Sequence, residues 1–238
     1  RHPGWPVFGH AYSTQQPFDG TWHHIAFVQD EGARALYVDG VLDDLAIDAK
    51  PEGDFLANDT SIGGILRAAA SHWVTGLIDD VAIWSRALSE EELGQVAASS
   101  VGDLIGGGEV DPVAEGLVSH WPLDEIQGTK TPDIASGYDM DISNLTSDDV
   151  VEGKNGNAFS FSNERQTLLS RVHAPDENLP ANKHESHTVS MWVNVVGEGQ
   201  TDLRVFSEGN TSDSNPLFNI GTHSGGTDGS VDFFIRHP

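Results

Sequence analysis

Short blocks of alternating apolar and polar residues recur along the chain. In residues 22–28, Ile25 and Phe27 fall on one face, and in residues 189–195 the face carries Val189, Met191, Val193 and Val195. Similar blocks, separated by Gly, Asp, Asn and Ser clusters, span 35–38, 78–84, 117–123, 157–161 and 231–235. Short strands at this spacing, without long helical periods, predict an all-β sandwich or barrel.

Local turn and cap signals refine this pattern. The triplet Asp30-Glu31-Gly32 separates two alternating blocks, and Gly and Asp tolerate the backbone angles of tight turns. We therefore expect an antiparallel hairpin here. A single short helix is predicted from Ser89 to Ala97, because Ser89 with Glu92 three residues later forms a capping box.

One stretch lacks any alternation. Residues 98–114 carry small and polar residues and a run of three glycines, Gly106 to Gly108. This composition is typical of a flexible connection, so we predict a linker segment at 98–114.

Composition and charge limit the classes of molecule that this protein is expected to bind. The 238 residues contain 37 acidic and 12 basic side chains, a formal net charge of −25, which disfavours binding to nucleic acid and to anionic membrane surfaces. The absence of cysteine excludes disulfides and thiolate chemistry. No apolar run approaches the roughly 20 residues that span a bilayer, so no membrane insertion is expected. No signal peptide is recognised, so export would need a targeting segment outside this sequence.

Three motifs resemble one extracellular family. They are Asp19-Gly20-Thr21-Trp22-His23-His24-Ile25-Ala26, then Ala35-Leu36-Tyr37-Val38-Asp39-Gly40, and the stretch 78–92 that begins Ile78-Asp79-Asp80-Val81. They are similar to motifs of the laminin-G-like jelly-roll family within the concanavalin A-like lectin-glucanase superfamily. The resemblance implies a two-sheet antiparallel jelly-roll sandwich, found at the cell surface or outside the cell.

The motifs stand in the reverse of the family's usual order. In the family these three belong to the C-terminal half of a domain, whereas residues 116–124, 133–137, 153–159 and the strand around 191–193 resemble its N-terminal half. We therefore interpret 1–97 (the N-terminal segment) as a C-terminal jelly-roll half and 115–238 (the C-terminal segment) as an N-terminal half. The triplet Arg-His-Pro both opens and closes the chain, so the sequence is expected to be a circular permutant or an out-of-phase slice of a tandem repeat.

A jelly-roll half leaves an apolar face and strand edges uncovered, so each half needs a complementary half. That half can come from the same chain or from a neighbouring copy, which would generate a head-to-tail filament. The leading functional hypothesis is a non-catalytic extracellular structural or adhesive module that assembles with copies of itself. The alternative is a carbohydrate-binding module of a cell-surface or secreted protein.

The resemblance also implies candidate site residues. A structural Ca²⁺ site would use Asp80 and Asp133, because calcium prefers several hard oxygen ligands. The alternative is that Asp133 caps a turn and Asp80 is solvated. For glycans, Trp5 and Trp73 are the candidate ligand-binding residues, because flat indole faces suit sugar rings.

Enzymatic activity is not expected. Glucanases of this superfamily carry a Glu-x-Asp-x-x-Glu strand, and no such string occurs. The neighbours Asp79 and Asp80 are expected to point to opposite faces of a strand, as are His23 and His24, so neither pair should act jointly on one bond or one ion.

Overall fold

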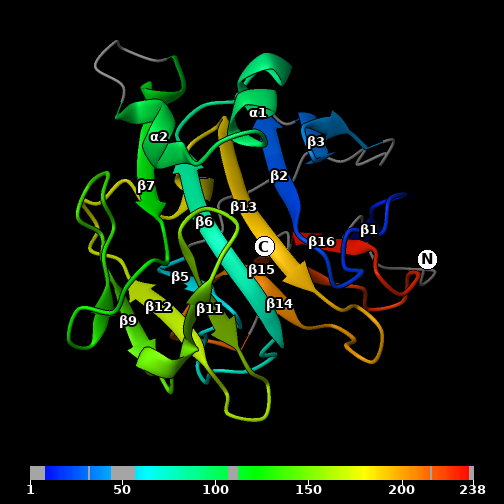
Figure 1. Ribbon diagram of the computed structural model, residues 1–238, viewed down its shortest axis with the longest axis vertical. Coiled ribbons are helices and arrows are strands. Elements are labelled where there is room, and N and C mark those ends of the chain that lie inside the picture. The colour runs from blue at the N-terminus through cyan, green and yellow to red at the C-terminus, as the bar shows by residue number, and fades with distance from the viewer. Residues whose placement is uncertain (1–8, 32, 44–56, 107–111, 215, 236–238) are drawn as a thin grey trace.

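The computed structural model describes residues 9–31, 33–43, 57–106, 112–214 and 216–235. In these ranges the chain forms two antiparallel sheets packed face to face (Figure 1). The predicted all-β, two-sheet antiparallel sandwich is therefore confirmed.

The first sheet has eight strands. In spatial order they are β1 (Gly9–Tyr12), β16 (Val231–Ile235), β15 (Pro216–Thr222), β14 (Arg204–Gly209), β5 (Asp59–Ile62), β12 (Leu168–Val172), β9 (Met140–Ser143) and β8 (Lys130–Thr131).

The second sheet also has eight strands. Their order is β10 (Val150–Glu152), β11 (Asn157–Phe161), β6 (Gly76–Trp84), β13 (His187–Val195), β2 (His23–Asp30), β3 (Ala33–Val38) and β4 (Val41–Leu42), and β7 (Leu117–Trp121) pairs with β6 on the same side as β11. Strands β2 and β3 form the hairpin predicted from the turn at residues 30–32.

Two α-helices lie together at one end of the second sheet (Figure 1): α1 (Glu90–Val96) and α2 (Val101–Ile105). The described residues also form three 3-10 helices: η1 (Pro112–Ala114), η2 (Ser147–Asp149) and η3 (Ala181–Lys183). The predicted capping box of α1 is present, since the Ser89 side chain accepts from the Glu92 N–H and the Glu92 carboxylate accepts from the Ser89 N–H. The predicted helix is therefore confirmed, whereas α2, which lies in the segment predicted as a linker, was not predicted.

Apolar side chains form two clusters. The larger lies between the sheets and includes Phe27, Trp121 and Phe206. The smaller lies on the outer face of the second sheet, where Val96 of α1 and Val101 of α2 pack with Trp84 of β6. The helices therefore close one outer face of the sandwich and leave the outer face of the first sheet to a loop, described below.

The linker segment is more ordered than its composition predicts. The side chain of Ser100 caps α2 by accepting a hydrogen bond from the Asp103 N–H, 3.0 Å away. Val101 and Val113 are fully buried against the second sheet, and the Trp84 indole donates to the Val113 carbonyl at 2.7 Å. Two well-placed valines and a cap thus hold both ends of this segment against the sandwich.

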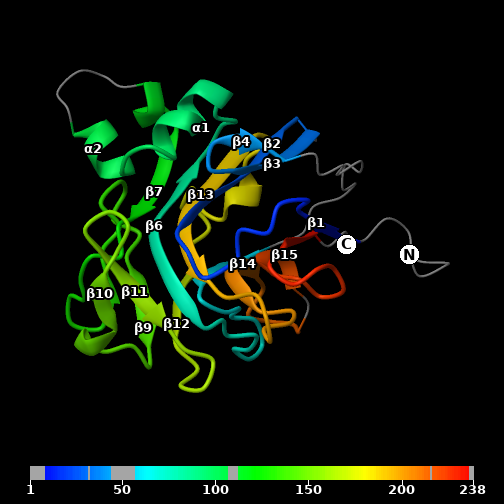
Figure 2. The same cartoon turned by 45° about the vertical axis from the view of Figure 1, so that its right-hand side comes forward.

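The two segments on either side interleave in both sheets. In the second sheet, β6 from the N-terminal segment lies between β11 and β13 from the C-terminal segment, and β13 in turn separates β6 from β2. In the first sheet β5 lies between β14 and β12, and β1 pairs with β16 at the edge (Figure 2). The apolar faces of the two segments are therefore covered within one chain. The permuted origin of the segments stays a prediction.

Candidate functional site

A row of side chains crosses the outer face of the first sheet. The strand register places Ser61 opposite Ser207, Ser207 opposite Asn219, Asn219 opposite Phe234, and Phe234 opposite His10. Side chains alternate between the faces of a strand. The neighbours on the same strands are core residues, namely Ile62, Phe206, Phe218, Ile220 and Phe233. The row therefore points away from the core.

The centre of this row is buried but not hydrogen-bonded. Ser207 is 0% exposed and Asn219 is 1% exposed. The Ser207 hydroxyl and both polar atoms of the Asn219 amide have no hydrogen-bond partner among the described residues. Buried polar groups are nearly always satisfied, and leaving one unsatisfied costs about 1–3 kcal/mol. Such groups indicate a place that water or a ligand completes.

The loop between β5 and β6 covers this part of the row. Its ends are joined, because the Val74 N–H donates to the Gly63 carbonyl at 3.0 Å. Inside it, the Leu66 N–H donates to the Ser61 hydroxyl at 3.0 Å, and Ile65 is buried. Residues 63–74 thus form a closed loop, here called the covering loop, that is fixed to the sheet.

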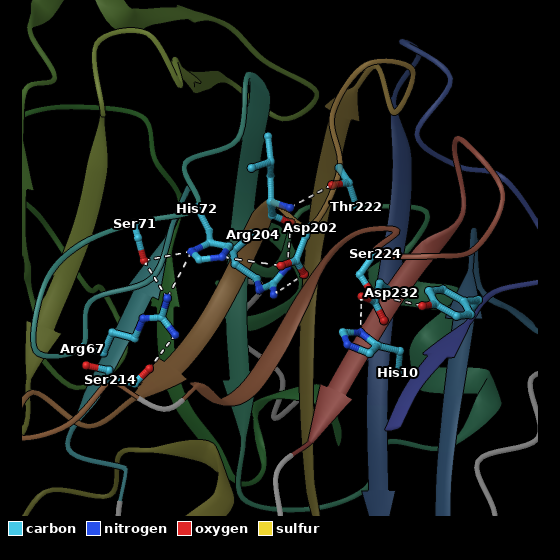
Figure 3. A network of polar contacts seen from close by, with 12 residues as sticks. His10, Arg67, Ser71, His72, Asp202, Arg204, Ser214, Thr222, Ser224 and Asp232 are labelled. Carbon is cyan, nitrogen blue, oxygen red and sulfur yellow. Dashed lines mark hydrogen bonds and ion pairs between the residues drawn. The ribbon is translucent and has the colours of Figure 1, made fainter. Parts of the chain in front are cut away.

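A pocket of about 210 Å³ opens between the covering loop and the end of the row. Its lining comes from four separate parts of the chain: Ile65, Arg67 and His72 of the covering loop, Asp202 and Arg204 at the start of β14, Phe234 of β16 and His10 of β1. Figure 3 shows the polar members of this lining in two groups of contacts, one that runs from Arg67 to Arg204 and one between His10 and Asp232.

The network runs from Arg67 through His72 and Asp202 to Arg204. Arg204 Nη2 lies 2.6 Å from Asp202 Oδ1, His72 Nε2 lies 3.5 Å from Asp202 Oδ2, and Arg67 Nη2 lies 3.4 Å from His72 Nδ1. A guanidinium can only donate, so His72 Nδ1 is the acceptor and its ring proton sits on Nε2, facing Asp202. Arg67 is held from behind by the Ser214 carbonyl, 2.7 Å from Nη1.

Electrostatics keep Asp202 ionised. Burial alone would raise the pKa of Asp202, but the hydrogen bond from His72 and the charge of Arg204 outweigh burial and lower it. On the other side of the pocket, His10 Nδ1 lies 2.7 Å from Asp232 Oδ2. Burial raises the pKa of Asp232, and the hydrogen bond from His10 opposes that rise.

Two lining residues adopt left-handed backbone angles. His72 has φ +56° and Asp202 has φ +61°. Outside glycine this conformation is uncommon, and in folded proteins such residues cluster at ligand-binding and active sites. Both belong to the Arg67–Arg204 network, so the surrounding hydrogen bonds fix an otherwise unfavourable backbone at this pocket.

We next consider Trp5 and Trp73, the two tryptophans that the sequence predicted to bind glycans. Trp5 is outside the described residues. Trp73 is half-buried, its backbone bridges to Arg204, and its indole N–H has no hydrogen-bond partner among the described residues. Its ring lies against Gly64, and the pocket lining contains its neighbour His72 rather than Trp73 itself.

Asp133, one of the two predicted calcium ligands, caps a turn. Its carboxylate accepts backbone hydrogen bonds from His120 (2.7 Å), Ala135 (2.9 Å), Ser136 (3.3 Å) and Tyr138 (2.9 Å). This is the alternative role considered for Asp133, and it uses both carboxylate oxygens.

Asp80, the other predicted ligand, is 4% exposed, so the expectation of a solvated Asp80 is wrong. Its carboxylate binds the His120 ring, the Val101 N–H at 3.0 Å and the Asn155 side chain at 3.2 Å. Asp80 therefore ties α2 and the loop at 153–156 to the sheet. Within the described ranges, no group of three His, Asp or Glu residues is arranged to hold a metal ion. The calcium site stays a prediction.

The strand alternation expected for Asp79 and Asp80 does not hold, because β6 is irregular at this pair; that the two carboxylates do not act on one bond stays a prediction. The pairing of β6 with β13 shifts register between Ser190 and Trp192, and Asp80 has φ +53° at this bulge. As a result Asn155 donates to both carboxylates, through its N–H to Asp79 Oδ2 at 2.8 Å and through its side chain to Asp80. Burial, opposed by these backbone bonds, raises the pKa of Asp79 to about 7. This cluster fills the gap between β11 and β7.

Sequence analysis found none of the pocket residues. They lie up to 224 positions apart, from His10 to Phe234, and none belongs to a local motif. The one usable signal was the alternating block 231–235, in which Phe234 falls on the face opposite Phe233. Only the sheet register brings that face beside His10 and the covering loop.

Comparison with known proteins identifies the first part of the chain. Residues 6–94, which reach from before β1 into α1, match the model of the concanavalin A-like lectin/glucanases superfamily, laminin G type. No curated protein matches the chain. Among the described residues, no helix is long and apolar enough to cross a membrane. Residues 6–94 are therefore similar to the laminin G type, and the described ranges fold as a two-sheet antiparallel sandwich that is consistent with a jelly roll.

Proposed function

We propose that this protein is a non-catalytic, extracellular carbohydrate-binding module and that its glycan site is the pocket beside His10 and Phe234. The match to a laminin G-type family supports a carbohydrate-binding or adhesive module, and such domains are typically extracellular. The observation that carries the proposal is the pair of buried, unsatisfied side chains, Ser207 and Asn219, which lie outside the lining and adjoin it through Phe234, the strand partner of Asn219.

The pocket offers what a sugar ring needs. A sugar hydroxyl both donates and accepts hydrogen bonds, and the lining offers donors in its arginines and an acceptor in Asp202. Phe234 supplies an apolar surface for the C–H face of a ring, as ligand pockets generally combine aromatic walls with few polar groups. A volume of about 210 Å³ is far more than the roughly 10–15 Å³ of such space that a single water needs, so the pocket has room for a ligand.

The same geometry supports binding rather than hydrolysis. Glycoside hydrolysis needs two carboxyl groups that flank the scissile bond. The described lining contains one carboxylate, Asp202, and that carboxylate is bound by Arg204 and His72.

The test is a glycan array followed by NMR titration with the sugars that bind. We expect Phe234→Ala and Asn219→Ala to weaken binding at least tenfold, whereas Val172→Ala, an exposed valine on β12 of the same sheet, leaves affinity unchanged. Because Asn219 is unsatisfied without ligand, Asn219→Ala should not lower the melting temperature. If Phe234→Ala and Asn219→Ala bind the glycan as tightly as the control Val172→Ala, the glycan site does not lie in this pocket.

Head-to-tail assembly is the second candidate. The N-terminal and C-terminal segments already complete each other within one chain, so assembly between chains would have to use other surfaces. The edge strand β4 offers one, since Val41 is 63% exposed and Leu42 is 48% exposed, and open strand edges pair with other chains. Light scattering of the purified protein tests this: a mass that rises with concentration, and that Val41→Lys abolishes, supports assembly, and a monomer at all concentrations refutes it.

A further inference from the structure

We propose that the pocket recognises a neutral sugar through two vicinal hydroxyls, and that the carboxylate of Asp202 accepts a hydrogen bond from each of them. This inference rests on the proposed glycan-binding function and names its ligand class and the residue that selects it. It comes from the place of Asp202 in the lining, from the contacts that fix this residue, and from the number of acceptor sites on a carboxylate.

Asp202 is open to the pocket. It is the one carboxylate in the described lining, and its side chain is 38% exposed, whereas the side chain of Arg204 beside it is 5% exposed. Figure 3 shows Asp202 between the side chains of the covering loop and the pair formed by His10 and Asp232. A ligand in this pocket therefore meets the carboxylate of Asp202 rather than its buried partner.

The chain holds Asp202 in place before a ligand binds. Its main-chain N–H donates to the His223 carbonyl at 2.9 Å. Its carboxylate oxygens are fixed separately, Oδ1 by Arg204 Nη2 at 2.6 Å and Oδ2 by His72 Nε2 at 3.5 Å. The left-handed backbone of Asp202, with φ +61°, is otherwise unfavourable, and these contacts maintain it. Fixing a binding group beforehand reduces the entropy that is lost when the ligand binds.

These contacts leave acceptor sites on both oxygens. An ionised carboxylate has about four lone-pair sites and can only accept, and the wall of the pocket uses one site on each oxygen of Asp202. The two oxygens lie side by side on one carbon. Hydroxyls on neighbouring carbons of a pyranose ring are also close together when they are gauche to each other. One carboxylate therefore matches one vicinal pair of hydroxyls.

The contact with Arg204 favours a neutral donor over a cation. The charge of Asp202 is already paired, because Arg204 Nη2 lies 2.6 Å from Oδ1, so a cationic ligand would compete with a buried arginine for the same carboxylate. A hydroxyl brings no charge and adds to the existing contacts, and its hydrogen bond to a carboxylate is stronger than one between neutral groups. Sugars with free vicinal hydroxyls therefore fit Asp202 better than amino sugars do.

The experiment removes ring hydroxyls one at a time. The methyl pyranosides of D-glucose, D-galactose and D-mannose present vicinal pairs that are both equatorial and pairs with one axial member. Each is titrated into ¹⁵N-labelled protein beside its derivatives that lack the hydroxyl at C2, C3 or C4. A hydrogen bond to a charged group is worth about ten- to hundredfold in affinity. We therefore expect the loss of either of two adjacent hydroxyls to weaken binding at least about tenfold, and the loss of the remaining one to weaken it less.

Asp202→Asn assigns the two hydroxyls to this carboxylate. An amide has one acceptor oxygen and no charge, so the parent sugar should bind at least about tenfold more weakly, and removal of at least one of the two hydroxyls should no longer change the affinity. A local change of fold would instead weaken parent and deoxy sugars alike and leave their ratio unchanged.

Asp141→Asn is the matched control. It removes one carboxylate at the opposite edge of the same sheet, where Asp141 Oδ1 lies 3.2 Å from Lys130 Nζ. Its affinities for parent and deoxy sugars should equal those of the unmodified protein.

The outcomes separate this inference from the proposed function. The inference is overturned if no two adjacent hydroxyls each contribute about tenfold, if Asp202→Asn keeps both losses, or if D-glucosamine binds at least tenfold more tightly than D-glucose. It is also overturned if none of the three hexosides binds while the array shows another glycan that Phe234→Ala releases. In each of these cases a glycan bound at the pocket still supports the proposed function. If no glycan binds on the array, the proposed function fails and this inference fails with it.

Discussion

Glu208 offers a sharp test of the buried polar groups in the first sheet. It lies on β14, is 0% exposed, and its carboxyl accepts backbone hydrogen bonds from Ala181 and Asn182 at the start of η3. Burial outweighs these two bonds and raises the pKa of Glu208 to about 8. In the unfolded chain a glutamate titrates near 4.3.

This shift makes stability depend on pH with a definite sign. Between about pH 4.3 and 8 the folded protein keeps a proton on Glu208 that the unfolded chain has lost, so the free energy of unfolding falls as pH rises. The contribution is fully present below about pH 4.3 and is lost as pH rises through about 8. The slope is about 1.4 kcal/mol per pH unit for this one group.

Glu208→Gln should remove this slope. Glutamine has the same shape and does not titrate, but its NH₂ group faces one of the two N–H donors, which costs about 1 kcal/mol for the lost hydrogen bond. The variant should thus be less stable than the parent at pH 4, equal to it near pH 5, and more stable by up to about 3 kcal/mol at pH 7.

Urea denaturation at five pH values from 4 to 8 measures the difference between the two proteins. Asp59, whose pKa burial raises to about 8, is present in both, so its own contribution cancels from the difference to first order. Two parallel stability curves across this range would show that Glu208 is already ionised in the folded protein and would refute the reasoning.

Three further predictions concern the rest of the sandwich. Glu92→Gln weakens both the α1 capping box and the ion pair with Arg86 (Nη2 to Oε1, 2.6 Å), so it should cost about 1 kcal/mol in thermal unfolding at pH 7; an unchanged melting temperature would contradict this. A chelator should leave the melting temperature unchanged, because the carboxylates of Asp80 and Asp133 are occupied by protein donors; a rise with added Ca²⁺ that Asp133→Asn abolishes would establish the calcium site. The N-terminal and C-terminal segments, expressed separately, should each be unfolded by circular dichroism and should form a folded complex when refolded together; a cooperative melt of either alone would argue against mutual completion.

Alternation of residue types was enough to find the central strands. The block at 231–235 matches β16, and 157–161 matches β11, because in each strand one face is apolar and packs in the core. The helix α1 was predicted because the signal is local: Ser89 and Glu92 satisfy each other's backbone within one turn. The fold class was therefore accessible from the sequence.

Residue alternation did not predict strands whose outer face is polar and yet buried. Strand β5 carries Asp59, Thr60 and Ser61, which are all fully buried although their sequence is typical of a turn. The covering loop buries part of this face, and that burial could not be predicted from the sequence of β5. Likewise, the bulge at Asp80 could not be predicted, because it depends on how β6 pairs with β13. Tertiary contacts decided both features.

The interleaving of the two segments has a consequence for biosynthesis. Strand β6 leaves the ribosome about a hundred residues ahead of β13, which later joins its long edge. At about 5–20 residues per second, that edge waits roughly 5–20 s for its partner. A nascent chain in this state presents open strand edges and apolar side chains to its surroundings, which makes it prone to aggregate until β13 has been synthesised.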